Sequence, residues 1–146
     1  MKEKFIKAYM DTAKIFAELS HARRLHVGAI IVKDDRIISI GYNGMPAGWD
    51  NDCEDQVYID DFHIELKTKP EVLHAETNAI AKLAKSTESG LNASMFVTHS
   101  PCLDCAKLIY QSGINAVFYR DSYRNEDGIQ FLKASGITVE QIEKDA

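Results

Sequence analysis

The chain has 146 residues, of which 45% are hydrophobic and 27% charged, as is ordinary for a soluble globular protein. The formal net charge of −5 argues against general binding to polymeric nucleic acid, because such binding usually needs an excess of Lys and Arg. No apolar run approaches the roughly 18 residues of a membrane span, and the N-terminal sequence lacks the apolar core of a signal peptide. We therefore expect one cytoplasmic domain covering residues 1–146.

The first half of the chain predicts a helix, a hairpin and a long loop, in that order. Apolar side chains at near-helical spacing predict a helix over residues 3–19. Two β-branched runs, 27–32 and 37–42, flank a tight polar turn and predict an antiparallel hairpin. From 43 to 70, Gly, Pro, Asp and Asn are frequent, and we expect a loop that is either functional or mobile.

The second half alternates helices with strands. Hydrophobic patterns predict helices over 75–85, 101–111 and 126–134, and strands over 93–98, 115–119 and 137–139. Because a helix separates each of these strands from the next, we expect them to pair in parallel through right-handed crossovers. The predicted fold is a three-layer α/β/α domain with a mixed five-stranded sheet that begins with the antiparallel hairpin.

Two short groups of residues carry the chemistry, and each falls where a helix is predicted to begin. The pair Cys102 and Cys105 lies on one helical face, so both sulfurs can reach one ion, and a helix N-terminus favours the thiolate form. His74 supplies a third ligand. Three protein ligands leave one position of a tetrahedral zinc ion open, as in a catalytic site.

Glu76 is the residue that favours an enzyme over a simple metal site. It lies two positions after His74, so its carboxylate can face the open position without binding the ion. Zinc lowers the pKa of bound water from 15.7 to about 7, and a neighbouring carboxylate can then move the proton of that water. Glu76 is therefore the predicted catalytic acid and base.

Other interpretations of these residues remain open at this point. A lone CxxC pair also occurs as a redox motif, or as half of a structural zinc site whose fourth ligand would be Cys53, His63 or His99. A basic run at residues 21–26, or Arg120 and Arg124, could hold a small anion despite the acidic net charge. Cys53 itself is expected to be a packed thiol.

His-Ala-Glu followed by Pro-Cys-x-x-Cys is the signature of zinc deaminases that act on bases. Residues 27–48, 69–80 and 98–119 resemble the deoxycytidylate (dCMP) deaminase family, within the cytidine deaminase-like superfamily, and the Gly-Tyr-Asn-Gly sequence at 41–44 is the most specific likeness. The resemblance implies the cytidine deaminase-like fold and zinc-dependent hydrolysis of dCMP to dUMP and ammonia, feeding thymidylate synthesis. It assigns zinc binding to His74, Cys102 and Cys105, and proton transfer to Glu76.

The same resemblance implies the residues that meet the substrate. Arg24 and His26 would lie near the phosphate, and Tyr123 would line the sugar pocket. The expected contacts with the sugar, phosphate and base also include Asn43, Gly44 and Ala75. Members of the family are often hexamers regulated by dCTP and dTTP near the 41–44 loop, so a homo-oligomer and such effectors are expected, although the idiosyncratic acidic insert at 51–68 would border that site.

Three alternatives compete with dCMP deamination. The first is a deaminase for cytidine, deoxycytidine or another free-base-like metabolite, which would have no use for a phosphate site. The second is a nucleic-acid-editing deaminase, against which the acidic composition argues. The third is a binding or regulatory module with a structural zinc, in which Glu76 would be dispensable.

Overall fold

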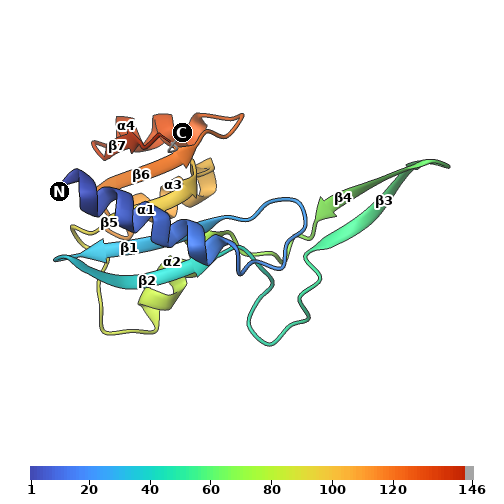
Figure 1. Ribbon diagram of the computed structural model, residues 1–146, viewed down its shortest axis with the longest axis horizontal. Coiled ribbons are helices and arrows are strands. Elements are labelled where there is room, and N and C mark those ends of the chain that lie inside the picture. The colour runs from blue at the N-terminus through green and yellow to red at the C-terminus, as the bar shows by residue number, and fades with distance from the viewer. Residues whose placement is uncertain (144–146) are drawn as a thin grey trace.

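The computed structural model describes residues 1–143 (Figure 1). Its helices are α1 (Glu3–Ala17), α2 (Ala75–Ala84), α3 (Leu103–Gln111) and α4 (Asp127–Ala134). Its strands are β1 (Gly28–Lys33), β2 (Arg36–Tyr42), β3 (Glu54–Asp60), β4 (His63–Thr68), β5 (Ser94–His99), β6 (Ala116–Asp121) and β7 (Thr138–Gln141). None of the helices in residues 1–143 is long and apolar enough to cross a membrane.

The main sheet has five strands in the order β2-β1-β5-β6-β7. β1 pairs with both β2 and β5 in antiparallel fashion, whereas β5, β6 and β7 run parallel to one another, as predicted. The β1–β2 turn is tight because Asp34 and Asp35 both adopt left-handed backbone conformations, with φ of 51° and 58°. The sequence therefore predicted the mixed sheet and its opening hairpin correctly.

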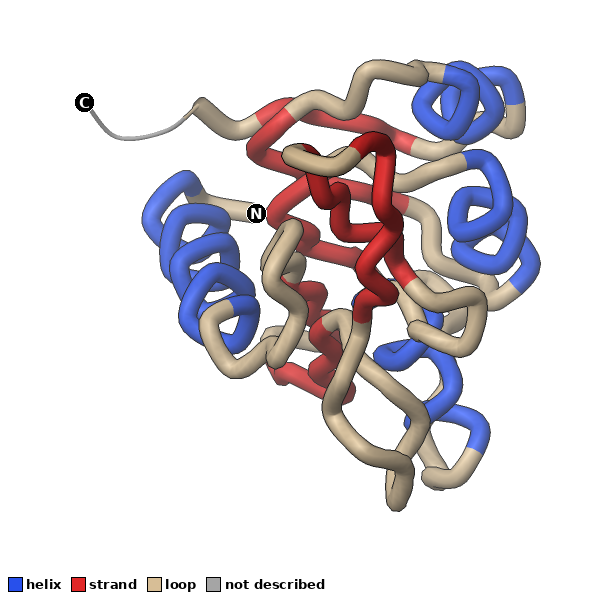
Figure 2. Tube along the Cα trace, turned by 90° about the vertical axis from the view of Figure 1, so that its right-hand side faces the viewer, coloured by secondary structure: helices blue, strands red, loops and turns tan. Residues whose placement is uncertain are grey.

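Helices cover both faces of this sheet and complete the three layers (Figure 2). Alternate residues of each strand face opposite layers. Ile30 and Phe96 pack beneath α1, where Phe96 stacks on Phe118 with ring centroids 4.7 Å apart. Ile31 and Val97 instead face the layer formed by α2, α3 and α4. Packing on both faces of the sheet fixes the position of the strand ends near which α2 and α3 begin.

The loop prediction for residues 43–70 was wrong over its second half. Residues 54–68 form a separate antiparallel hairpin, β3–β4, which we call the arm and which projects from the body of the protein (Figure 1). Most of its residues remain exposed, including the consecutive apolar side chains of Val57, Tyr58 and Ile59. Without a buried face, the apolar and polar positions gave no clear strand pattern in the sequence.

Candidate active site

Two helix N-termini meet at one end of the sheet and build the centre of the site. His74 directly precedes α2, and Cys102 directly precedes α3; both have extended backbones, with ψ of 156° and 169°. Neither helix has a side-chain cap hydrogen bond. The peptide dipoles of both helices therefore point their positive ends at the same small region, which favours thiolates there.

The three predicted ligands converge. One ligand atom from each of His74, Cys102 and Cys105 lies within 4.8 Å of the others, and they form a candidate metal group within the described part of the chain. The Nδ1 atom of His74 lies 3.3 Å from Sγ of Cys105 and 3.6 Å from Sγ of Cys102. Tetrahedral zinc with its usual bond lengths separates nitrogen and sulfur ligands by roughly 3.5 Å, so the three side chains fit that ion.

The electrostatics of the ligands suit a cation. Hydrogen bonds from Cys105 and His74 lower the pKa of the Cys102 thiol, despite the opposing effect of burial. The pKa of Cys105 is raised, because its hydrogen bond to Cys102 and its burial both favour the neutral thiol. Thr77 Oγ1 lies 3.7 Å from Cys105 Sγ and gives that sulfur a further polar neighbour. A metal ion would supply the positive charge that a second thiolate needs.

Glu76 lies in the first turn of α2 and is only 4% exposed. Burial raises the pKa of its carboxyl above the ordinary value, although His74 and hydrogen bonding oppose the shift. A carboxyl in such surroundings can hold a proton as well as release one, as a proton shuttle must. The sequence prediction placed Glu76 beside the ligands, and the structure brings it there.

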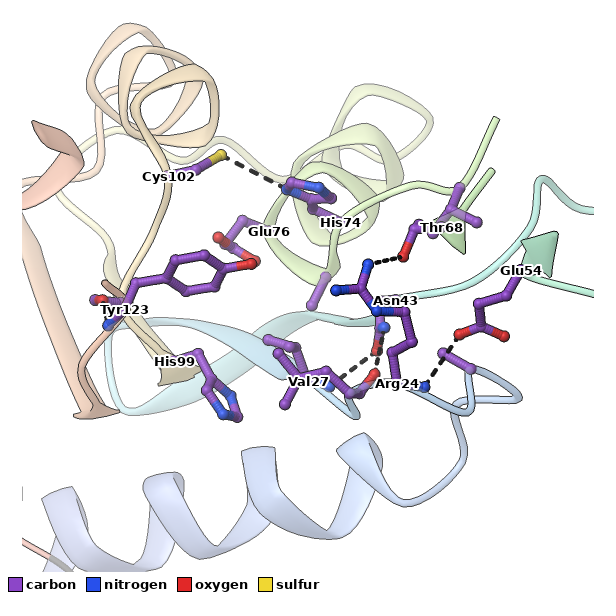
Figure 3. A pocket seen from close by; sticks show the side chains of 15 residues that line it. Arg24, Val27, Asn43, Glu54, Thr68, His74, Glu76, His99, Cys102 and Tyr123 are labelled. Atoms are coloured by element: carbon purple, nitrogen blue, oxygen red, sulfur yellow. Dashed lines mark hydrogen bonds between the residues drawn. The ribbon is translucent and has the colours of Figure 1, made fainter. Parts of the chain in front are cut away.

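A cavity of about 310 Å³ opens in front of these residues (Figure 3). The predicted site residues that line it are Arg24, Asn43, His74, Ala75, Glu76, Cys102 and Tyr123. Arg24 Nη1 donates a hydrogen bond to Thr68 Oγ1 at 3.3 Å, and in Figure 3 both residues lie on the other side of the cavity from Cys102. The aromatic side chain of Tyr123 extends into the cavity, and its backbone N–H is held by Ser100 Oγ at 2.7 Å. The cavity thus has a metal-binding end and a cationic end.

The side chain of Asn43 holds the segment that leads into β1. Its side-chain amide donates to Leu25 O at 2.7 Å and accepts the Val27 N–H at 2.9 Å. These two bonds fix the chain between Arg24 and β1, so Asn43 also positions the neighbouring wall of the cavity.

Two predicted contact residues do not line the cavity. His26 instead places Nε2 2.6 Å from the Ala22 carbonyl oxygen and Nδ1 3.7 Å from Glu18. Gly44 exchanges backbone hydrogen bonds with Leu73, and so ties the 41–44 loop to the segment that precedes His74. Both residues support the walls of the cavity from outside.

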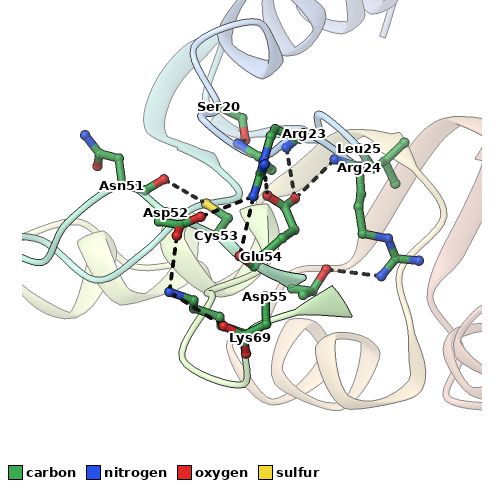
Figure 4. Close-up of polar contacts among 12 residues, drawn as sticks. Ser20, Arg23, Arg24, Leu25, Asn51, Asp52, Cys53, Glu54, Asp55 and Lys69 are labelled. Atoms are coloured by element: carbon green, nitrogen blue, oxygen red, sulfur yellow. Dashed lines mark hydrogen bonds and ion pairs between the residues drawn. The ribbon is translucent and has the colours of Figure 1, made fainter. Parts of the chain in front are cut away.

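Glu54 is an important residue that the sequence interpretation missed (Figure 4). It is 2% exposed, and Oε2 accepts the backbone N–H groups of Arg23 and Arg24 at 2.9 and 3.1 Å. The Arg23 guanidinium lies against its other oxygen, with Nε 3.4 Å from Oε1. Glu54 thereby fixes the turn that presents Arg24 to the cavity. No local signal revealed this, because Glu54 lies some thirty residues away at the base of an arm that was expected to be a loop.

The alternative zinc ligands do not join the metal group. Cys53 is 1% exposed, and its Sγ lies 3.6 Å from the Asn51 carbonyl, as expected of a packed thiol. His63 contacts Asp60 at the tip of the arm. His99 lines the cavity but lies near Asp121, with Nε2 3.5 Å from Oδ2. Among the described residues the site therefore offers three ligands, which leaves a tetrahedral position for a reactant.

Comparison with known proteins agrees with this geometry. Residues 3–121 match the model of the cytidine and deoxycytidylate deaminase zinc-binding region. The chain belongs to this family. The candidate metal group of His74, Cys102 and Cys105 lies within the matched residues.

Several relatives are similar over most of the chain. Deoxycytidylate deaminase of Enterobacteria phage T4 is 38% identical, over 92% of this chain and 88% of that protein. The ComE operon protein 2 of Bacillus subtilis is 38% identical, over 94% of this chain and 70% of its own length. The crystal structure of a dCMP deaminase from cyanophage S-TIM5, in complex with dCMP and dUMP, is 45% identical, with a TM-score of 0.87 over 97% of this chain and 99% of that one. These likenesses also confirm the expected three-layer deaminase fold.

Proposed function

We propose that this protein is a zinc-dependent deaminase that hydrolyses dCMP to dUMP and ammonia. The observation that carries the proposal is the buried carboxyl of Glu76 beside three converging metal ligands, in a cavity whose other end holds Arg24. The similarity to deoxycytidylate deaminases of phage, yeast and human origin supports the choice of substrate.

The reaction adds water to the cytosine ring and releases the amino group as ammonia. When bound, zinc acts as a Lewis acid that lowers the pKa of water to about 7. Glu76 accepts a proton from the attacking water and delivers it to the ring nitrogen. The new hydroxyl on the ring carbon then gives its proton through the same carboxyl to the amino group, which leaves as ammonia when the C–N bond breaks and the carbonyl forms. Burial of Glu76 favours this role, because it raises the pKa of the carboxyl and so helps it to hold a proton between the two transfers.

Arg24 gives the cavity a preference for a phosphorylated substrate. Its planar guanidinium is suited to bind two phosphate oxygens at once. The neighbouring acid, Glu54, is already engaged by two backbone N–H groups and by Arg23, so its negative charge is largely offset. A nucleotide phosphate at this end would orient the cytosine ring toward Glu76, with Tyr123 beside the sugar.

Several finer features belong to the same proposal. We expect dUMP from this reaction to feed thymidylate synthesis, and dCTP and dTTP to act as effectors of a homo-oligomer, a hexamer by resemblance to the family. A cytoplasmic location is consistent with the three cysteines, all of which are free thiols. No polymeric nucleic acid is expected as a partner.

An ammonia-release assay with dCMP, CMP, deoxycytidine, cytidine and dCTP, with and without triphosphates, tests the proposal. We expect the highest kcat/KM with dCMP. Arg24→Ala should raise the KM for dCMP about tenfold or more and leave cytidine turnover unchanged, since a charged hydrogen bond is worth about 1.5–3 kcal/mol. Equal rates with cytidine and dCMP would refute the assignment of substrate, and strong salt-sensitive binding of an oligonucleotide would favour an editing enzyme.

A further inference from the structure

The arm is a two-stranded sheet that lacks the support such a sheet usually needs. β3 and β4 pair with each other from Glu54–Thr68 outward to Asp60–His63. Within the described residues, no other helix or strand packs extensively on either of them. An isolated hairpin is marginally stable in water, whereas three or more strands with an apolar face are stable. The arm is therefore expected to gain stability by pairing with a further strand.

One face of the arm carries a cluster of apolar side chains beside Gln56. Directly opposed residues share a face, so Tyr58 and Ile64 lie together and Leu66 follows two positions along β4. Tyr58 is 73% exposed and Ile64 54% exposed, which is unusual for neighbouring large side chains.

The free edge of β4 has a definite pattern of backbone groups. The N–H of Lys69 bonds to the carbonyl of Cys53 at 2.8 Å, in register with the arm. Because hydrogen-bonded pairs alternate along an antiparallel ladder, Lys67 and Glu65 also direct their backbone groups at β3. The backbone groups of Ile64, Leu66 and Thr68 then point outward, away from β3.

We propose that β4 pairs in antiparallel fashion with β4 of a second copy of this chain, across a twofold axis at Leu66. In that register the outward groups of Leu66 face those of the partner's Leu66, and Ile64 faces the partner's Thr68. Glu65 then lies opposite the partner's Lys67, and Lys67 opposite the partner's Glu65. The strand is complementary to itself in hydrogen bonding, in charge and in apolar contact.

Pairings centred on the neighbouring charged residues of β4, or on β3, lack this complementarity. A twofold axis at Glu65 or Lys67 would place identical charges directly opposite each other, which is destabilising. On β3, an axis at Gln56 would place Asp55 against the partner's Val57 and would need Glu54, which is buried in its own subunit, at the interface. The Leu66 register gives a four-stranded sheet with Tyr58, Ile64 and Leu66 of both copies on one face.

This interface would reach the rim of the active-site cavity. Thr68 ends β4, and its hydroxyl accepts the hydrogen bond from Arg24. Pairing of its backbone with the partner's Ile64 would hold Thr68 in place, and through it the guanidinium. The second copy would thus stabilise the cationic end of each cavity without contributing a catalytic group. The inference does not depend on which cytosine compound is the substrate.

Charge reversal tests the register. In the Leu66 register, residue 65 of each copy faces residue 67 of the other, so the interface contains two such pairs. Glu65→Lys makes both pairs Lys–Lys, and Lys67→Glu makes both pairs Glu–Glu. Each variant should weaken self-association of the full chain about tenfold in sedimentation equilibrium. Mixing the two variants should restore assembly, since every Lys then faces a Glu. Association that neither substitution weakens, or that mixing fails to restore, would overturn the register.

Proline substitution tests the edge. Leu66→Pro removes an outward N–H and keeps the bonds to β3, so it should dissociate the β4 contact. Gln56→Pro makes the same change on the outer edge of β3 and is the matched control, with assembly expected to match the unsubstituted chain. A monomeric unsubstituted chain, or equal assembly of both proline variants, would refute the interface, while ammonia release by the same samples reports separately on the proposed activity.

Discussion

Removal of the Glu54 carboxylate should weaken substrate binding without slowing the chemical step. Glu54→Ala leaves two partly buried backbone N–H groups, of Arg23 and Arg24, without their shared acceptor. Hydrogen bonds to a charged group contribute about 1.5–3 kcal/mol each, so the free energy of unfolding should fall by about 3 kcal/mol or more. The turn that presents Arg24 would also loosen, and the KM for dCMP should rise about tenfold while kcat changes little.

The assay compares urea unfolding and steady-state kinetics for two variants. Asp52→Ala is the matched control, because Asp52 also contacts the Arg23 guanidinium, at 3.3 Å, but lies on the surface with a side chain 60% exposed. Exposed pairs of this kind contribute about 0–1 kcal/mol. Cytidine, which has no phosphate, should be turned over equally by both variants. If Glu54→Ala left the stability and the KM for dCMP unchanged, Glu54 would not position Arg24.

Three further predictions concern the metal end of the cavity. Glu76→Gln should lower kcat by about 10²–10⁴ with bound zinc retained, as measured by metal analysis and ammonia release; normal turnover would exclude Glu76 as the proton shuttle. Removal of zinc with a chelator should abolish ammonia release and lower Tm, both recovering when zinc is added back, and activity in metal-free protein would contradict the zinc mechanism. Gly128→Ala should lower zinc affinity and stability, because the added methyl would meet Pro101 O and lie 2.8 Å from the Cys102 carbonyl carbon; unchanged zinc binding in a competition assay would show that α3 can shift without cost.

Local sequence patterns were enough to predict the metal end of the site. Each ligand lies at a helix start, so the N-termini of α2 and α3 and the spacing of Cys102 and Cys105 could be inferred from short segments. The crossovers between β5, β6 and β7 followed from the alternation of helices and strands. These features depend on neighbours in sequence, or on the general rules of parallel sheets.

The cationic end depended on contacts between distant segments. The basic run was visible, but its spacing could not decide between Arg24, which faces the cavity, and His26, which faces Ala22 and Glu18. The role of Glu54 required knowledge of the arm, whose strands bury almost no surface and so leave little periodic signal. Tertiary contacts of exposed segments are the part that residue patterns do not encode.

The hydrogen bond from the Lys69 N–H to the Cys53 carbonyl joins the two ends of the arm at its base. Because the two ends of a fifteen-residue excursion meet there, the hairpin between Glu54 and Thr68 can lengthen or shorten with little effect on the body, at a modest entropic cost for each added residue. Arm length is thus a variable that evolution or an engineer can adjust independently of the chemistry. The tip, around Phe62, is a suitable place to graft a label, an affinity tag or a new recognition segment.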